Sequence, residues 1–63
     1  METEILSNDQ AAAYLKVSPT TLPRWRWAGT GPNFLRLGRS VRYRKSDLDL
    51  FLAESLVEVG RSA

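Results

Sequence analysis

The sequence contains no cysteine and no histidine among its 63 residues. Disulfide frameworks, zinc fingers, thiol nucleophiles and imidazole acid-base catalysis are therefore excluded, and only carboxylates, hydroxyls and amines remain for chemistry. A chain of this length also buries only about 60% of its unfolded surface, so it cannot enclose a large cavity. We expect no enzymatic activity, no metal site and no cofactor.

Long apolar runs are missing as well. The longest, residues 11–15, is far shorter than the roughly 20 residues that cross a bilayer, so we expect no membrane association. The start of the chain, Met1-Glu2-Thr3-Glu4, is acidic, whereas a secretory signal needs a positively charged first region. With 43% hydrophobic and 25% charged residues, the composition is typical of a soluble folded domain, and an intracellular location is expected.

Acidic residues are absent from residues 16–45, which hold eight of the nine bases. The flanking residues 1–15 and 46–63 each carry a net charge of −3, so the overall charge of +2 is the sum of three unlike segments. A segment of +8 indicates a surface that meets a polyanion, although a basic face that is only solvated remains an alternative. The preference for arginine over lysine, seven to two, favours bidentate recognition of phosphate and guanine.

Two helix signals follow each other closely in the first half of the chain. The run Ser7-Asn8-Asp9-Gln10 fits a capping box, and it predicts a helix that extends to about Lys16 with Ala11 and Leu15 in the core. Ser18 followed by Pro19 is a second start signal. Because only one or two residues separate the two helices, the layout is that of a helix-turn-helix.

The second predicted helix spans Pro19 to about Ala28 and is ended by Gly29. By this count Pro23 is the fifth helical residue and removes one helical hydrogen bond. Either the first turn is 3₁₀-like or the regular helix starts later, and we expect a distorted opening turn.

A β-hairpin is predicted from residues 34–37 and 41–44, joined by the three-residue loop 38–40. The period of two places Leu35 with Leu37 and Val41 with Tyr43, and these form an apolar back that packs on the helices. The arginines at positions 36, 42 and 44 then point the other way. The hairpin is predicted to be a basic ribbon.

A third helix is predicted to begin at Ser46 as the N-cap, with Asp47 and Asp49 in its first turn. Its apolar stripe comprises Leu48, Phe51, Leu52, Leu56 and Val59. The whole chain, residues 1–63, then forms one α+β domain with a core over about 5–59 and a frayed tail at 60–63. The element order α-α-β-β-α is that of a compact winged helix-turn-helix.

This layout suits double-stranded DNA. A helix of about ten residues is roughly 15 Å long and fits the major groove, which is about 12 Å wide, while the hairpin tip reaches the adjacent backbone or minor groove. The expected contacts from the second helix are Thr20, Thr21, Arg24 and Arg26, and those from the wing are Arg36, Arg39, Ser40, Arg42 and Arg44.

Each of these contacts has a plainer alternative. An exposed arginine is often only solvated, and one wing arginine can instead pair with Asp47 or Asp49. Trp25 and Tyr43 are expected in the core, and Trp27 either packs on the flank of the domain or contacts the DNA backbone. About six phosphate contacts predict a slope of −5 to −6 for log affinity against log salt.

Several runs together resemble the excisionase-type branch of the MerR-like winged helix-turn-helix proteins. They are Leu6-Ser7, residues 11–22 (AAAYLKVSPTTL), Arg24-Trp25, Gly31-Pro32 and residues 37–48 (LGRSVRYRKSDL). The resemblance covers about residues 6–53. It departs from the family at Pro23, where members usually have a residue that continues the helix and often touches DNA.

The resemblance implies a function as well as a fold. A free-standing chain of this size is similar to phage excisionases, also called recombination directionality factors. These are not catalysts: they bind neighbouring attachment sites, bend the DNA, and help an integrase excise rather than integrate. The implied partners are DNA, a phage integrase and further copies of the chain bound cooperatively, in the cytoplasm of a bacterial host.

Other functions remain open at this stage. The same domain occurs in small prophage-type transcriptional regulators, and a basic ribbon can also serve a protein-protein adaptor. The acidic flanks, including Glu54 and Glu58, can contact basic patches on neighbouring copies. A catalytic cluster of Lys45, Ser46 and Asp47 is disfavoured, because a helix cap already explains the serine and the aspartate.

Overall fold

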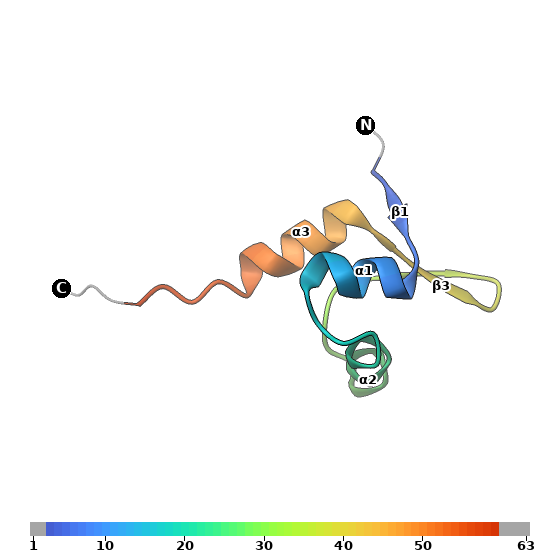
Figure 1. Cartoon of the computed structure of the whole chain (residues 1–63), viewed down its shortest axis with the longest axis horizontal. Coiled ribbons are helices and arrows are strands. Elements are labelled where there is room, and N and C mark those ends of the chain that lie inside the picture. The colour runs from blue at the N-terminus through green and yellow to red at the C-terminus, as the bar shows by residue number, and fades with distance from the viewer. Residues whose placement is uncertain (1–2, 60–63) are drawn as a thin grey trace.

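The computed structural model describes residues 3–59, which form three helices and a three-stranded antiparallel sheet (Figure 1). In chain order the elements are β1 (Ile5–Leu6), α1 (Asn8–Leu15), α2 (Thr21–Ala28), β2 (Leu35–Leu37), β3 (Ser40–Arg44) and α3 (Lys45–Glu54). The predicted α+β winged helix-turn-helix is confirmed, with β1 as an addition. The expected frayed tail, residues 60–63, lies outside the described residues.

The start of α1 is the predicted capping box. The backbone N–H of Gln10 donates to the Ser7 hydroxyl at 3.1 Å, and the Ser7 N–H donates to the Gln10 side-chain carbonyl at 2.9 Å. The helix ends at Leu15, and its C-cap Lys16 has a left-handed φ of 60° that turns the chain toward α2. Local sequence therefore specifies the start of α1.

The helix α2 begins two residues later than predicted. Ser18 does not cap it but holds the turn: its hydroxyl accepts from the Thr20 N–H at 3.3 Å and its carbonyl from the Thr21 N–H at 2.9 Å. Pro23 is consequently the third residue of α2. The backbone N–H groups of the first four helical residues have no acceptor within the helix, so a proline at this position removes no helical hydrogen bond. Of the two alternatives at Pro23, the later helix start is observed, and no helical hydrogen bond is lost there.

The hairpin has a two-residue loop rather than the predicted three-residue loop. Leu37 pairs with Ser40, which leaves only Gly38, with a φ of 63°, and Arg39 in the turn. Leu35 then lies opposite Arg42, and Arg36 lies opposite Val41. Directly paired residues share a face, so Arg36 lies on the same side of the sheet as Val41 and Tyr43.

The predicted ribbon, with an apolar back and all three arginines in front, was therefore wrong. Arg42 and Arg44 share the other face with Leu35 and Leu37, and Leu37 is 54% exposed. A one-residue change in loop length shifts the register of the two strands by one residue. The side chains of one strand then lie on the opposite face of the sheet relative to those of the other strand.

The strand β1, which was not predicted, ties the N-terminal segment to the end of the wing. It pairs with β3, placing Leu6 beside Tyr43, and the sheet order is β1-β3-β2. Beyond the strand, the Lys45 N–H donates to the Glu4 carbonyl at 2.8 Å and the Ser46 N–H to the Thr3 hydroxyl at 2.9 Å. The start of α3 is therefore satisfied by a distant segment, and the prediction that Ser46 is its N-cap was wrong.

The helix α3 is shorter than its apolar stripe suggested. It ends at Glu54, so Leu56 and Val59 lie beyond it and are 68% and 86% exposed. Of the predicted stripe, Leu48 is buried, Phe51 is half-buried and Leu52 is largely exposed. The last part of the described chain extends away from the domain, on the side opposite the hairpin tip (Figure 1).

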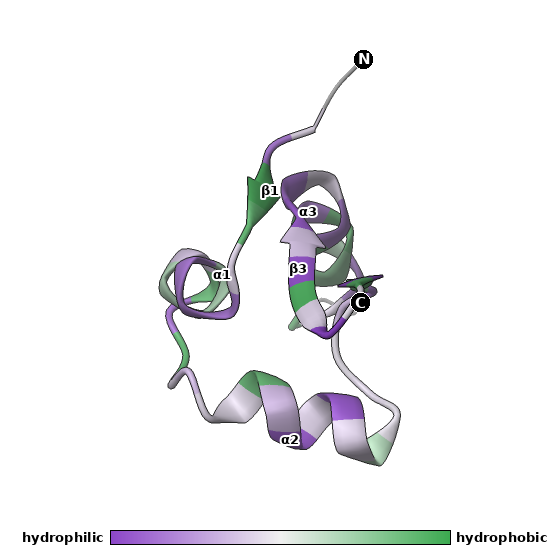
Figure 2. Ribbon diagram, turned by 90° about the vertical axis from the view of Figure 1, so that its right-hand side faces the viewer, coloured by the Kyte–Doolittle hydropathy of each residue, from purple (hydrophilic) through white to green (hydrophobic). Residues whose placement is uncertain are grey.

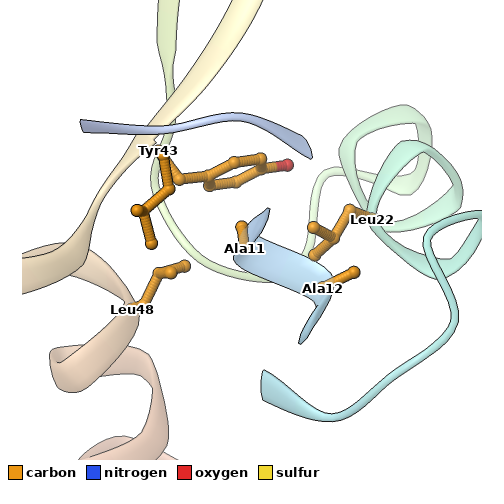
Figure 3. Close-up of a cluster of buried hydrophobic side chains, with 6 residues drawn as sticks. Ala11, Ala12, Leu22, Tyr43 and Leu48 are labelled. Atoms are coloured by element: carbon orange, nitrogen blue, oxygen red, sulfur yellow. The ribbon is translucent and has the colours of Figure 1, made fainter. Parts of the chain in front are cut away.

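The core lies around α1, against which α2, α3, β1 and β3 pack. Its buried residues are Leu6, Ala11, Ala12, Leu22, Tyr43 and Leu48. Figure 3 shows the two alanines of α1 between Leu22 of α2 and Leu48 of α3, with the Tyr43 ring above them. Because alanine is small, both neighbouring helices approach the α1 backbone closely. Ala11 was predicted in the core; Leu15 is half-buried against it.

Candidate nucleic-acid interface

The helix α2 lies along one edge of the domain and turns one side outward (Figure 2). Its inner side is anchored by buried Leu22 and by Trp25, whose ring lies 5.4 Å from that of Phe51. Its outward side, which we call the recognition face, is exposed and consists of Thr20, Pro23, Arg24, Trp27 and Ala28. A shallow hollow of about 550 Å³ lies on this helix.

The predicted DNA-contacting residues of α2 differ in their exposure and in whether their side chains already have partners within the domain. Arg24 is exposed and makes no hydrogen bond or ion pair with any other described residue. Thr20 is exposed at the N-cap, with its hydroxyl 2.9 Å from that of Ser18, and Thr21 is half-buried. Of these side chains, Arg24 is the one best placed to reach a ligand.

Arg26 is committed to the interior of the domain. Its Nη1 donates to the Asn8 side-chain oxygen at 3.0 Å and to the Tyr43 hydroxyl at 2.7 Å. The Asn8 amide in turn donates to the Pro19 carbonyl at 3.0 Å. This network joins α1, the turn, α2 and β3, and it fixes the orientation of the recognition face. That Arg26 contacts DNA stays a prediction, and its Nη1 already has two partners.

Phe34, just before β2, connects the recognition helix with the wing. The guanidinium carbons of Arg26 and Arg36 lie 5.8 Å and 5.7 Å from the centre of its ring, within the range of cation-π attraction. The ring also packs 6.2 Å from that of Tyr43. Positive groups from α2 and from β2 therefore meet at one aromatic side chain.

The tip of the wing is open to a ligand. Arg39 and Ser40 are both exposed, and neither side chain bonds to another described residue. Arg42 is half-buried, and its Nη1 donates to the Val41 carbonyl at 2.9 Å. The wing thus offers Arg39 at its tip and Arg42 on its outer face.

Arg44 is the wing arginine that forms an internal ion pair. Its Nε and Nη2 donate to the two oxygens of Asp47 at 2.7 Å and 3.1 Å, and this bidentate bond raises the pKa of Arg44. The alternative expected from the sequence, pairing with Asp47, is therefore observed. At this position much of the positive charge is compensated within the domain.

A second charged cluster lies where α1 meets α3. The Tyr14 hydroxyl donates to Asp49, and that bond raises the pKa of Tyr14. Asp49 also lies 3.8 Å from the Lys45 ammonium, which sits 5.3 Å from the centre of the Tyr14 ring. Lys45 therefore pairs with an acidic residue of its own helix, one turn further along α3.

Sequence reasoning missed the two residues that organise the surface. Asn8 was interpreted only as part of a capping box, and Phe34 only as a strand residue. Asn8 bonds to residues 11 and 18 positions away, and Phe34 lies against Arg26, 8 positions before it, as well as Arg36. Apart from Arg36, these partners are too distant for a local pattern to indicate them.

A tight helix pair with an outward second helix, followed by an arginine-bearing hairpin, defines a winged helix-turn-helix DNA-binding domain. Residues 5–55 match the helix-turn-helix domain family, and the chain belongs to this family, a DNA-binding family that includes excisionase-like members. No curated protein matches the chain closely enough to count as a relative. Over residues 3–59, no helix is both long enough and apolar enough to cross a membrane.

Proposed function

We propose that this chain is a sequence-specific, non-catalytic DNA-binding protein that acts as a phage-type excisionase. It binds attachment-site DNA, bends it, and directs an integrase toward excision. The observation that carries the proposal is the joining of α2 and the wing at Phe34, because it lets one rigid domain hold a major groove and the adjacent backbone together. The sequence resemblance over about residues 6–53 supports the excisionase role.

The mechanism follows from the distribution of free and committed groups. Arg24 contacts base edges from the recognition face, while Arg36, Arg39 and Arg42 neutralise phosphates along the wing. Arg26 positions α2 through Asn8 and Tyr43. Holding the groove and the flanking backbone at once favours a bent duplex over a straight one, since the bend brings more phosphates to the protein.

One domain presents one recognition helix, so a single copy binds weakly, and adjacent copies on one duplex bind cooperatively. The acidic residues of α3 and beyond, Glu54 and Glu58, are exposed and contact basic groups of the neighbouring copy. Charge reversal at these two glutamates that left cooperative binding unchanged would count against this contact.

The role is tested by excision in vitro with the integrase, attachment-site DNA, and the protein present or absent. We expect excision to depend on the protein and integration to be suppressed by it. Specific DNA binding with no effect on either reaction would instead support the alternative, a small prophage-type transcriptional regulator. No binding to duplex DNA at physiological salt would support the adaptor hypothesis.

The base-reading role of Arg24 is tested by Arg24→Ala, with Arg39→Ala as the matched control from the wing. Arg24→Ala is expected to cost about 1–3 kcal/mol on the preferred site and little on scrambled DNA. Arg39→Ala should weaken both duplexes alike. Equal losses on both duplexes for Arg24→Ala would refute base reading at this position.

A further inference from the structure

The recognition face carries an apolar feature that the phosphate contacts leave unexplained. Trp27 is 92% exposed, and Pro23 is exposed one helical turn before it, so the two side chains are neighbours on the outside of α2. We call this pair the apolar ridge. An almost fully exposed indole leaves a large apolar surface in water, and aromatic side chains of this kind dominate binding interfaces.

The surroundings of the ridge indicate what covers it. Arg24 borders it, and residues 16–45 contain eight bases and no acid, so the face attracts a polyanion. Pro23 has no N–H and therefore offers a partner apolar contact alone. A nucleic-acid partner must present an apolar group at this place.

In the major groove, one base-edge group is apolar: the C5-methyl group of thymine. We propose that Pro23 and Trp27 read thymine methyl groups, as a specificity determinant beside Arg24. The proposal rests on the proposed insertion of α2 into the major groove. It gives Pro23 a function, because a residue with no backbone donor is tolerated at the third helical position and presents a rigid apolar surface there.

The experiment begins with the full chain and a pool of random-sequence duplexes, from which the wild-type protein selects its preferred site. Each thymine of that site is then replaced singly by 2′-deoxyuridine, which keeps the base pairing and removes the methyl group. We expect one or two thymines at which wild-type affinity falls about fourfold, the value of one buried methyl group. All other replacements should be neutral.

Variants of the protein connect the effect to the ridge. Trp27→Ala and Pro23→Ala, tested separately, should each abolish the loss of affinity that deoxyuridine causes at one of those thymines. Comparing each variant and the wild-type protein on both duplexes gives a double-mutant cycle between the side chain and the methyl group. The matched control is Leu56→Ala, which removes another exposed apolar side chain, at a residue outside α2. It should keep the full sensitivity. Circular dichroism confirms that each variant is folded.

The outcomes separate the inference from the proposed function. If the wild-type protein selects no site, the proposed function fails and the inference with it. If it selects a site that lacks thymine, or one where deoxyuridine has no effect, DNA recognition stands and the methyl reading is overturned. The inference also fails if Trp27→Ala keeps the sensitivity, or if it dissociates a dimer of the free protein, since the ridge would then be a contact between copies.

Discussion

Single residues of the basic segment have different tasks although they carry the same charge. Arg24 and Arg39 are exposed and make no bond within the described chain, so they are available to a ligand. Arg26 and Arg44 hydrogen-bond to side chains of their own domain. Net charge therefore overstates the binding surface, and the partners of each guanidinium decide which arginines contribute to it.

The Arg26 network predicts a stability difference between two tyrosines. Tyr43→Phe removes an acceptor from a charged, partly buried guanidinium while keeping the packed ring, so the free energy of unfolding should fall by about 1–2 kcal/mol. Tyr14→Phe removes a solvent-exposed hydroxyl and should change it by less than about 0.5 kcal/mol. Urea denaturation measures both, and equal losses would show that the network contributes nothing.

Two glycines after α2 allow a similar comparison. Gly29 and Gly31 both have a positive φ, 79° and 87°, but a Cβ at position 31 would lie 2.9 Å from the Trp25 Cβ, whereas position 29 faces open space. Gly29→Ala should cost about 1–2 kcal/mol from backbone strain alone. Gly31→Ala should cost about 2–4 kcal/mol because overpacking adds to that strain. Thermal unfolding ranks them, and a smaller loss at Gly31 would contradict the close contact.

At the scale of elements, the effect of replacing a serine at a helix start depends on whether that serine's own side chain caps the helix. Ser7→Ala removes the acceptor for the Gln10 N–H and should destabilise the fold by about 1 kcal/mol. Ser46→Ala is the control, because the Ser46 hydroxyl bonds to no described residue, and its effect should stay within about 0.5 kcal/mol. Chemical denaturation checks both. A loss at Ser46 as large as that at Ser7 would restore Ser46 as a cap.

The hairpin shows why the candidate site was only partly predictable. Alternation correctly placed Leu35 with Leu37 and Val41 with Tyr43, but it carries no information on how the two strands pair. A three-residue loop would put both pairs on one face, whereas the observed two-residue loop puts them on opposite faces. That Arg36 shares a face with Val41 and Tyr43 therefore depends on a single residue of loop length.

For the whole molecule, the bonding of Arg26 and Arg44 within the domain lowers the number of phosphate contacts, and with it the expected salt dependence of DNA affinity. The arginines left for phosphates are Arg36, Arg39 and Arg42. Three contacts predict a slope of about −2.7 for log affinity against log salt, shallower than the −5 to −6 expected when six bases are counted. Fluorescence titration of a duplex at several salt concentrations measures the slope.

Removing single arginines tests that revision. Arg39→Ala should make the slope shallower by about 0.9, whereas Arg44→Ala should change it much less, because Asp47 already neutralises Arg44. A wild-type slope near zero would overturn DNA binding, and equal changes for both variants would show that the Arg44 ion pair opens on DNA.

The sequence by itself determined the features whose causes are local. The capping box of α1, the tight link to α2, the presence of a hairpin and the +8 charge of residues 16–45 all depend on neighbours in the chain. Only the tertiary structure decided the pairing of β1 with β3, the capping of α3 by Thr3, and the contacts of Arg26 with Asn8, Tyr43 and Phe34. Most of those contacts join residues far apart in sequence, and packing around Ala11 and Ala12 brings them together. A local sequence pattern carries no information about partners at that distance along the chain.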